Sequence, residues 1–328
     1  MIIAGDIGGT KCTITVFAES GTALRPVFRF SAATRECASV SDLLERFKAQ
    51  AEKKGCALAG DLTAAFGVAG ALDHDRMASI NLPWPVERSA LAHGLNLDPA
   101  RTLLMNDLVA SATSLAFLAE SDLVVLNPGT AEPHAPKALI AVGTGLGEAI
   151  LFWDGHGYRV FPAEGSLTEF APRNDREILL LQGMRRRLPR VCCEDVVSGR
   201  GFRAIHQVLF PEAHHEWLEE SDAAARITQQ AMEGSCPACV ETLQIWMEAY
   251  GSEAGNMALR SLSYGGVYIA GGIALKILPK LQEGAFLRAF TDKGTLSGQL
   301  ARIPIYIVRN EDAVVLGAAH AALQHQRR

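Results

Sequence analysis

Apolar residues along the chain fall into short runs typical of buried strands, and the two halves of the sequence open in the same way. Residues 2–18 begin with an apolar run, pass through a glycine turn at 8–10 and then alternate between apolar and polar positions, which predicts a β-hairpin. In the second half, the apolar run 138–142 leads into a glycine turn at 143–147 and a returning strand over 148–153. Each half is therefore predicted to open with a strand, a glycine turn and a strand.

The rest of the pattern predicts a mixture of strands and helices. Apolar residues at helical spacing predict a helix over 41–53, for which Ser41 is a good N-cap. The segment 79–85 contains two prolines and predicts a loop, and the proline-containing segment 127–137, between the halves, predicts a linker or an exposed loop. Further strands are predicted at 26–30, 62–68, 102–105, 158–161, 267–270 and 303–308, and further helices at 86–95, 108–118, much of 174–262 and 313–324.

Length and composition limit the class of protein. A chain of 328 residues suggests two domains at about 150 residues each. The net charge of −5 does not favour a nucleic-acid or membrane partner, and no apolar stretch has the length of a membrane span. The first predicted strand begins at residue 2, so we expect no signal peptide. Seven cysteines, an odd number at scattered positions, indicate a reducing cytoplasm.

The first glycine turn has the composition of a phosphate site. An apolar strand delivers Asp6 to a turn that contains Gly8, Gly9 and Thr10. Glycines let backbone N–H groups approach a phosphate, the hydroxyl adds a donor, and a neighbouring carboxylate can hold Mg²⁺ directly or through water. The alternative is an ordinary hairpin with a Gly-Gly turn that Asp6 only caps.

The second glycine turn, Gly143-Thr144-Gly145-Leu146-Gly147, is not a dinucleotide-binding motif. Its spacing is G-x-G-x-G, and residues 148–151 continue as a strand rather than a helix. The chain also lacks the G-x-x-x-x-G-K-[ST] sequence of P-loop proteins. Two such turns at the mouths of two strand pairs suit a nucleotide clamped between two domains, with one turn at each end of the triphosphate.

Several acidic residues are candidates for catalysis or binding. Asp107 follows a predicted strand and is preceded by Asn106, so it can take a proton from an attacking hydroxyl while the amide orients the acceptor. An equally local interpretation is that Asp107 caps the helix 108–118. Glu164 and Glu194 lie beside glycines or loops, where such side chains are more often solvated than ligands.

Cys236 and Cys239 form a lone C-x-x-C. A zinc site needs a second pair of ligands, and the adjacent His214 and His215 are too close together to supply one. A redox motif is expected at the start of a βαβ unit, whereas this pair lies in a helical stretch. We therefore expect Cys236 and Cys239 to be structural, like Cys192-Cys193.

Taken together, these motifs resemble the bacterial glucokinase family, within the actin–hexokinase superfamily of ATPases. The resemblance runs over nearly the whole chain, in the order and at spacings similar to those of the family. The matching segments are GDIGGT at 5–10, MND at 105–107, GTGLG at 143–147, AEGSLTEFAP at 163–172, EDVVSGRGF at 194–202, YGGVYIAGGI at 264–273 and FTDKG at 290–294.

The resemblance implies an α/β fold of two RNase-H-like domains, each a mixed sheet flanked by helices, with sugar and ATP bound in the cleft between them. The small domain is expected at 1–112 plus 312–328 and the large domain at 113–311. The implied activity is ATP-dependent phosphorylation of the 6-hydroxyl of glucose in the cytoplasm, with Mg²⁺, and we expect a homodimer. Implied roles are the general base for Asp107; sugar contacts for Asn106, Asp107, Glu164, Glu194 and Asn81; phosphate or nucleotide contacts for Asp6, Gly8, Gly9, Thr10, Lys11, Gly143, Thr144, Gly145, Gly271 and Gly272; and Mg²⁺ binding, through water, for Asp6.

One position departs from the family pattern. The family motif after the glutamate is E-G-G-H, in which the histidine contacts the sugar, and this chain has Leu167 in its place. Leucine cannot hydrogen-bond a hydroxyl, and a buried hydroxyl without a partner costs about 1–3 kcal/mol. Two alternatives therefore stay open: a kinase for another hexose or sugar, and a sugar-sensing protein of low turnover on the same fold.

Overall fold

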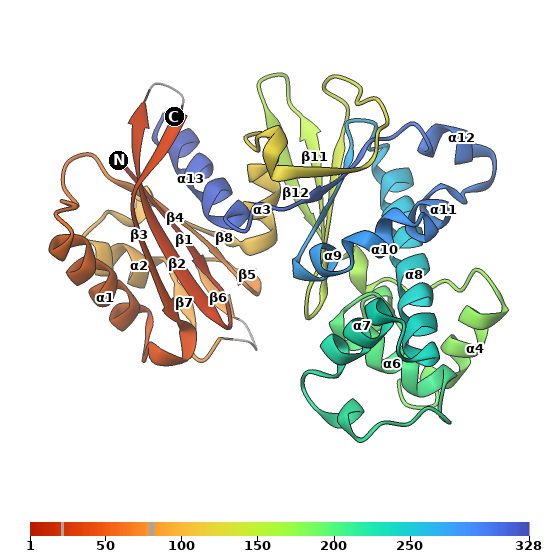
Figure 1. The fold of residues 1–328 in the computed structure, drawn as a ribbon. Coiled ribbons are helices and arrows are strands. Elements are labelled where there is room, and N and C mark those ends of the chain that lie inside the picture. Colours follow the sequence, from red (N-terminus) through yellow and green to blue (C-terminus); the bar gives the residue numbers. More distant parts are fainter. Residues whose placement is uncertain (21–22, 79–81, 328) are drawn as a thin grey trace. The chain divides into compact units, whose positions relative to one another are not determined.

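A computed structural model describes residues 1–20, 23–78 and 82–327 of the chain (Figure 1). Its contacts divide the chain into two compact units, of which the first is Met1–Ala119 with Asn310–Arg328 and the second is Glu120–Arg309. The chain thus leaves the first unit, forms the second and returns to the first. The expected domains, 1–112 with 312–328 and 113–311, remain a proposal.

The first unit is built on a five-stranded mixed sheet. The first three strands of the chain are antiparallel neighbours. The fourth strand of the sheet pairs in parallel with the first strand of the chain, and the fifth pairs in parallel with the fourth. In spatial order these strands are β3 (Ala23–Ala33), β2 (Lys11–Ser20), β1 (Ile2–Ile7), β4 (Thr63–Val68) and β8 (Thr102–Asn106), and a small antiparallel sheet beside them contains β5 (Ala71–Asp73), β6 (Arg76–Ala78) and β7 (Val86–Glu87).

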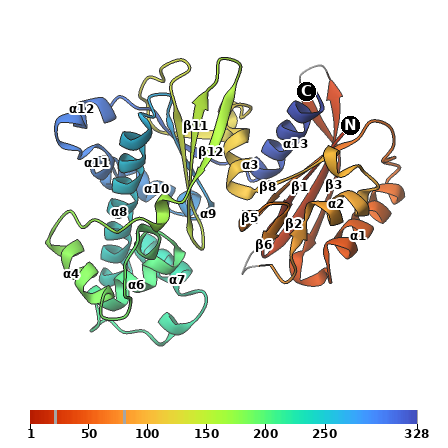
Figure 2. The same ribbon diagram turned by 180° about the vertical axis from the view of Figure 1, so that it is seen from behind.

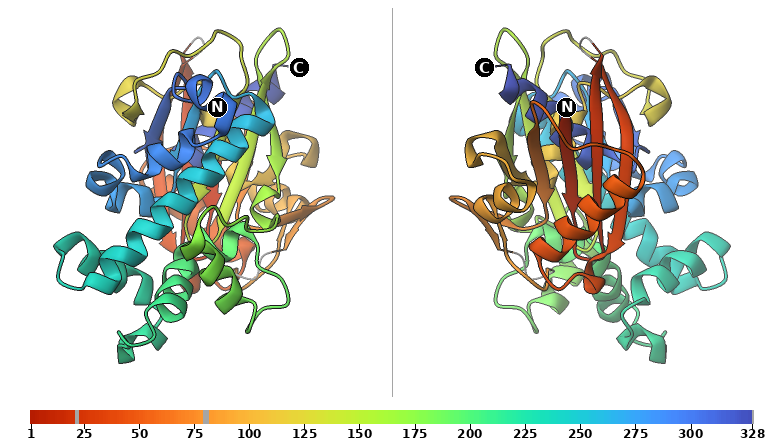
Figure 3. Two further views of the ribbon diagram at one scale, coloured as in Figure 1. Left: turned by 90° about the vertical axis from the view of Figure 1, so that its right-hand side faces the viewer. Right: turned by 90° about the vertical axis from the view of Figure 1, so that its left-hand side faces the viewer.

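Helices cover both faces of the first sheet (Figures 1 and 3). Helices α1 (Val40–Lys53) and α2 (Arg88–Leu95) pack on the face that carries Ile3 and Ile7. Helices α3 (Asp107–Ser114) and α13 (Ala313–Gln326) pack on the face that carries Ile2 and Ala4. Because β1 is buried on both faces, its sequence is an apolar run rather than an alternation.

The second unit repeats this plan around a six-stranded sheet. Three antiparallel strands come first, two strands add in parallel, and one antiparallel strand closes the edge. In spatial order these strands are β12 (Tyr158–Ala163), β11 (Leu146–Trp153), β10 (Lys137–Val142), β13 (Val267–Ala270), β14 (Ile305–Val308) and β9 (Leu123–Asn127).

The long helix α8 (Pro237–Ser261) crosses the second sheet and organises the helices around it (Figures 2 and 3). The Tyr250 hydroxyl donates a hydrogen bond to the Ile140 carbonyl of β10 over 3.3 Å, and Trp246 is fully buried in the same core.

No described helix is both long enough and apolar enough to cross a lipid bilayer. The other helices are α4 (Asp175–Met184), α5 (Cys193–Val196), α6 (Gly199–Leu209), α7 (Ala223–Glu233), α9 (Gly272–Lys276), α10 (Leu278–Gln282), α11 (Ala285–Thr291) and α12 (Ser297–Leu300), and the 3-10 helices of the chain are η1 (Thr34–Glu36), η2 (Pro99–Arg101), η3 (Glu120–Asp122), η4 (Gly165–Leu167), η5 (Glu216–Glu219) and η6 (Gly294–Leu296).

Several predicted boundaries were wrong. The N-cap of α1 is Ser39 rather than Ser41, because the Ser39 hydroxyl accepts the Asp42 N–H over 3.1 Å. Helix α3 ends at Ser114 rather than at residue 118, since the Leu115 N–H bonds back to Ala112 and tightens the last turn. Of the two alternatives for the segment 127–137, the loop is confirmed, since it joins β9 to β10, and the linker is wrong, since the segment lies inside the second unit.

Candidate active site

The first glycine turn, Gly8 to Thr10, joins β1 to β2 and is fixed by a threonine from farther along the chain. The Gly8 N–H donates to the Lys11 carbonyl over 3.1 Å, which closes the hairpin. The Thr34 hydroxyl donates to the Gly8 carbonyl over 2.6 Å, and the Thr34 N–H donates to the Thr10 carbonyl. Gly9 and Thr10 are exposed at the tip of the turn, so a phosphate can reach their N–H groups.

Asp6, near the end of β1, carries a strongly perturbed carboxyl group. Burial, followed by the negative charges of Asp107 and Asp312, raises its pKa from 3.8 to about 7, while the positive charge of Lys11 opposes this shift. Asp312 precedes α13 and forms an ion pair with Arg29 of β3. Negative charge therefore gathers near Asp6, and a bound cation would relieve it. Sequence reasoning missed Asp312, because only the fold brings α13 back to β1.

Asn106 is the N-cap of α3, and Asp107 is the first residue of this helix. The Asn106 side chain caps the helix: its Oδ1 accepts the Leu108 N–H over 2.8 Å, and its Nδ2 donates to the Gly70 carbonyl over 2.8 Å. Asp107 is the first residue of the helix and is held by the Leu108 N–H, which its Oδ1 accepts over 2.9 Å. Burial raises the pKa of Asp107. The interpretation of Asp107 as the N-cap is therefore wrong, since Asn106 has that position.

The absence of a side chain at Gly67 allows α3 to lie close to the sheet. Gly67 of β4 is the parallel partner of Asp6 in β1. A Cβ atom there would lie 3.0 Å from the Ala110 Cβ, 2.5 Å from the Val314 Cγ1 and 3.5 Å from the Asp107 Cα. Sheet and helix therefore meet directly beside Asp6, which fixes the start of α3 and with it Asp107.

The second glycine turn joins β10 to β11 and is supported by Glu194. The Gly143 N–H donates to the Gly145 carbonyl over 3.0 Å, and the Gly143 carbonyl accepts the Gly199 N–H at the start of α6. Glu194 Oε2 accepts the Leu146 N–H over 3.0 Å, and its Oε1 forms an ion pair with Arg200 over 2.6 Å. The turn is shorter than predicted, because β11 begins at Leu146 and not at residue 148.

We expect Gly145→Ala to lower the unfolding free energy by about 1–3 kcal/mol, through loss of the Glu194 contact. A Cβ atom at Gly145 would lie 2.6 Å from Glu194 Oε2, whereas nothing lies within 4 Å of one at Gly143. Gly143→Ala is therefore the matched control and should change stability by less than about 0.5 kcal/mol. Urea unfolding of both variants measures the difference, and equal losses would show that Glu194 does not support the turn.

Gly271 and Gly272 lie at the end of β13, beside the second turn. Gly271 has a φ of 95°, and a Cβ atom there would overlap the backbone of Val142, the residue that precedes the turn. Helix α9 then begins at Gly272. The structure thus brings Gly271 and Gly272, both predicted to contact the nucleotide, next to the Gly143–Gly145 turn within one unit.

Glu164 is exposed and precedes η4, and beneath this segment lies a buried carboxylate that sequence reasoning missed. Glu148 of β11 is 2% exposed, and its Oε1 has no hydrogen-bond partner among the described residues. Burial, together with the negative charge of the neighbouring Glu253, raises its pKa from 4.5 to about 7. A Cβ atom at Gly165 would overlap the Glu148 carboxylate, so this glycine lets the 164–167 segment lie directly over it. The sequence signal for this buried carboxylate was that Glu148 lies in an otherwise apolar strand.

Comparison with known proteins identifies the family. The model of the family described as Glucokinase matches residues 3–325. A glucokinase from Nostoc sp. is 34% identical over 348 residues, which cover 98% of each chain. The chain belongs to the glucokinase family. Among solved structures, a glucokinase from an Antarctic psychrotroph has a TM-score of 0.85 at 24% identity, covering 98% of each chain, and a Balamuthia mandrillaris glucokinase in complex with glucose has a TM-score of 0.79 at 21% identity, covering 98% of this chain and 93% of that one.

As a member of the glucokinase family, the chain is a sugar kinase with the actin–hexokinase type of fold. The first unit gathers Asp6, the Gly8–Thr10 turn and Asp107 at one end of its sheet. The second unit gathers the Gly143–Gly145 turn, Gly271 and Glu194. Lys11 contributes its carbonyl to the first turn, and Asn81 lies outside the described residues.

Proposed function

We propose that this protein transfers the γ-phosphoryl group of ATP to the 6-hydroxyl of glucose. Membership of the glucokinase family and the glucose complex of the Balamuthia mandrillaris relative support this substrate. The observation that carries the proposal is Asp107, a half-buried carboxylate at the first position of α3, held there by its own helix and by the capping Asn106.

Asp107 acts as the general base in this proposal. Its carboxylate accepts the proton of the sugar 6-hydroxyl while the hydroxyl oxygen forms a bond to the γ-phosphorus, and the bond from that phosphorus to ADP breaks. A pKa raised by burial makes Asp107 a stronger base than a solvated aspartate. Asn106, Glu164, Glu194 and Asn81 are the proposed partners of the other sugar hydroxyls.

The two glycine turns hold the phosphates. Backbone N–H groups of Gly8–Thr10 and of Gly143–Gly145 donate hydrogen bonds to phosphate oxygens, where charge accumulates in the transition state. The proposed nucleotide contacts also include Lys11, Gly271 and Gly272.

The carboxylates around Asp6 fit Mg²⁺, because a hard cation would offset both the burial and the repulsion from Asp107 and Asp312 that raise the pKa of this carboxyl. Asp6 would hold the ion, through a water molecule. The bound ion would supply charge neutralisation at the phosphates.

A panel of sugars with coupled detection of ADP tests the proposal. We expect glucose to give the highest kcat/KM. A higher value for mannose, an amino sugar or a disaccharide would show a kinase for that sugar. Tight sugar binding without sugar-dependent ADP formation would show a sensing protein instead.

Leu167→His is expected to lower the KM for glucose roughly tenfold, because the imidazole restores a hydrogen bond to a sugar hydroxyl. Leu167 is 44% exposed at the end of η4, so a histidine can enter without disturbing the core. Leu167→Phe is the control, since it adds a ring of similar size without a donor. If both variants leave the KM unchanged, residue 167 does not face the sugar.

A further inference from the structure

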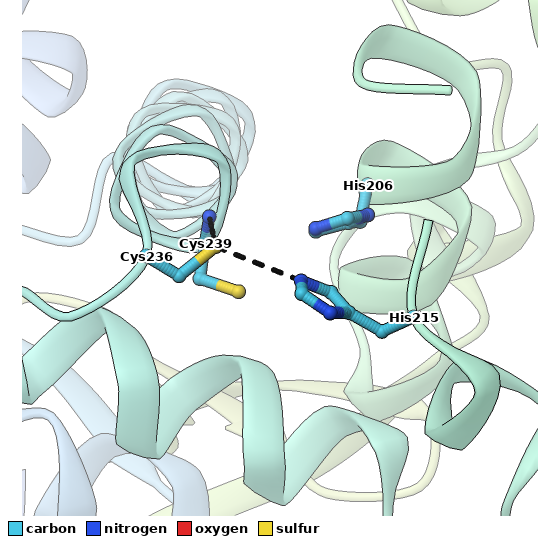
Figure 4. A group of neighbouring side chains, drawn as sticks. All are labelled: His206, His215, Cys236 and Cys239. Carbon is cyan, nitrogen blue, oxygen red and sulfur yellow. Dashed lines mark hydrogen bonds between the residues drawn. The ribbon is translucent and has the colours of Figure 1, made fainter. Parts of the chain in front are cut away.

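Four side chains from three separate segments of the second unit point toward one another (Figure 4). His206 lies on α6, His215 precedes η5, and Cys236 and Cys239 lie at the N-terminal end of α8. One nitrogen or sulfur atom from each lies within 4.8 Å of the others, and the Cys236 Sγ is 3.8 Å from the His215 Nε2.

His206 is the least explained member of this group. Its side chain is fully buried, and neither ring nitrogen has a hydrogen-bond partner among the described residues. Buried polar groups are nearly always partnered in folded proteins. The ring instead faces His215, with 5.9 Å between the ring centroids, and the two thiols (Figure 4). An imidazole in this position is explained if one nitrogen binds a metal ion.

The two cysteines are arranged as metal thiolates commonly are. Cys236 is the N-cap of α8, and its Sγ accepts the Cys239 N–H over 3.4 Å. Cys236 and Cys239 are three residues apart at the start of one helix, a spacing that places both side chains on the same face. Cys239 is fully buried, and its thiol donates a hydrogen bond to the Gln230 Oε1 over 3.6 Å. Both cysteines are free, so the pair is not a disulfide.

We propose that His206, His215, Cys236 and Cys239 bind one zinc ion. Two thiolates and two imidazoles form a Cys₂His₂ set, which is a common set for structural tetrahedral zinc. Bond lengths of about 2.3 Å to sulfur and 2.0 Å to nitrogen place tetrahedral ligand atoms about 3.3–3.8 Å apart, so these atoms need to move inward by less than about 1 Å. Four protein ligands leave no position for substrate, which assigns the ion a structural role.

The ion would join elements that the chain connects only by loops. Residues 210–222 lie between α6 and α7 and contain one short helix, η5. Zinc would tie the middle of this segment, at His215, and the second half of α6, at His206, to the first turn of α8. Helix α6 also contacts the second glycine turn at its other end, where the Gly199 N–H donates to the Gly143 carbonyl. The proposal thus gives Cys236 and Cys239 a metal-binding role, which differs from the purely structural role expected from the sequence.

Cobalt substitution tests the site directly. The full-length protein, purified with a reductant, is stripped with a chelator and titrated with Co²⁺. We expect about one Co²⁺ per chain, the intense visible bands of a tetrahedral ion and a thiolate-to-cobalt charge-transfer band, all abolished when Zn²⁺ displaces the cobalt. The double substitution Cys236→Ser and Cys239→Ser, and separately His215→Gln, should lose or greatly weaken the signal.

Two matched variants serve as controls. His214→Gln changes the exposed neighbour of His215, and Cys56→Ser changes a free cysteine of the first unit; both should keep the full signal. If the double variant does not fold, the wild-type spectrum, His215→Gln and a zinc-dependent protection of residues 210–222 from protease still decide. Failure of the reduced wild-type protein to bind Co²⁺ in this geometry would overturn the proposal. These readouts are independent of sugar phosphorylation, so they do not depend on the proposed function.

Discussion

Asp107→Asn is expected to lower kcat for sugar phosphorylation by about 10²- to 10⁴-fold while sugar affinity changes little. The amide has nearly the shape of the carboxylate but cannot take the proton of the 6-hydroxyl. Its oxygen can still accept the Leu108 N–H, and the helix cap belongs to Asn106, so α3 keeps its position. The loss should therefore appear in the chemical step rather than in folding or binding.

Steady-state kinetics and calorimetric sugar binding separate the two effects. Asp175→Asn is the matched control, because Asp175 is also the first residue of a helix, α4, but is exposed. In the wild type, kcat should fall as pH drops through the pKa of Asp107, which burial raises above the ordinary 3.8. Near-normal turnover in Asp107→Asn would show that another group takes the proton.

Features determined by neighbouring residues in the sequence could be predicted. The apolar run Ile2–Ala4, the turn at Gly8–Thr10 and the strand before Asn106 all exist where local pattern placed them, because buried strands and glycine turns need particular residues at particular positions. Boundaries set by hydrogen bonds were less predictable. Two serines near the start of α1 were possible caps, and the choice of Ser39 depends on the bond to Asp42.

Features that depend on residues far apart in sequence could not be predicted. Asp312 reaches Asp6 only because the chain returns to the first unit, and nothing near Asp312 signals this. A zinc site at Cys236 and Cys239 is not evident from the sequence, because His206 lies 30 residues before Cys236 and is separated from His215 by the end of α6. Of the adjacent histidines His214 and His215, only His215 lies with the two thiols.

Asp6→Asn is expected to stabilise the metal-free protein while it abolishes most of its activity. The folded pKa of Asp6 is about 7, above the ordinary 3.8, so between these values the folded state binds more protons than the unfolded state. Wild-type stability should therefore fall as pH rises from about 4 to about 7. Asparagine carries no charge, and at about pH 8 the variant should be more stable by about 1–4 kcal/mol, where the upper value is the full shift at 1.36 kcal/mol per pKa unit.

The same substitution should lower kcat/KM by about 10²-fold or more, because an amide binds Mg²⁺ and its water more weakly than a carboxylate does. Urea unfolding across this pH range, in chelator and then with added Mg²⁺, measures the stability term; added Mg²⁺ should stabilise the wild type more than the variant. Glu148→Gln is the control, since burial also raises the pKa of Glu148 to about 7, but in the second unit. It should reduce the pH slope without changing the response to Mg²⁺. If Mg²⁺ stabilises Asp6→Asn as much as it stabilises the wild type, the ion binds elsewhere. The repulsion of Asp6 by Asp107 and Asp312 would then need another cation, such as a lysine, to offset it.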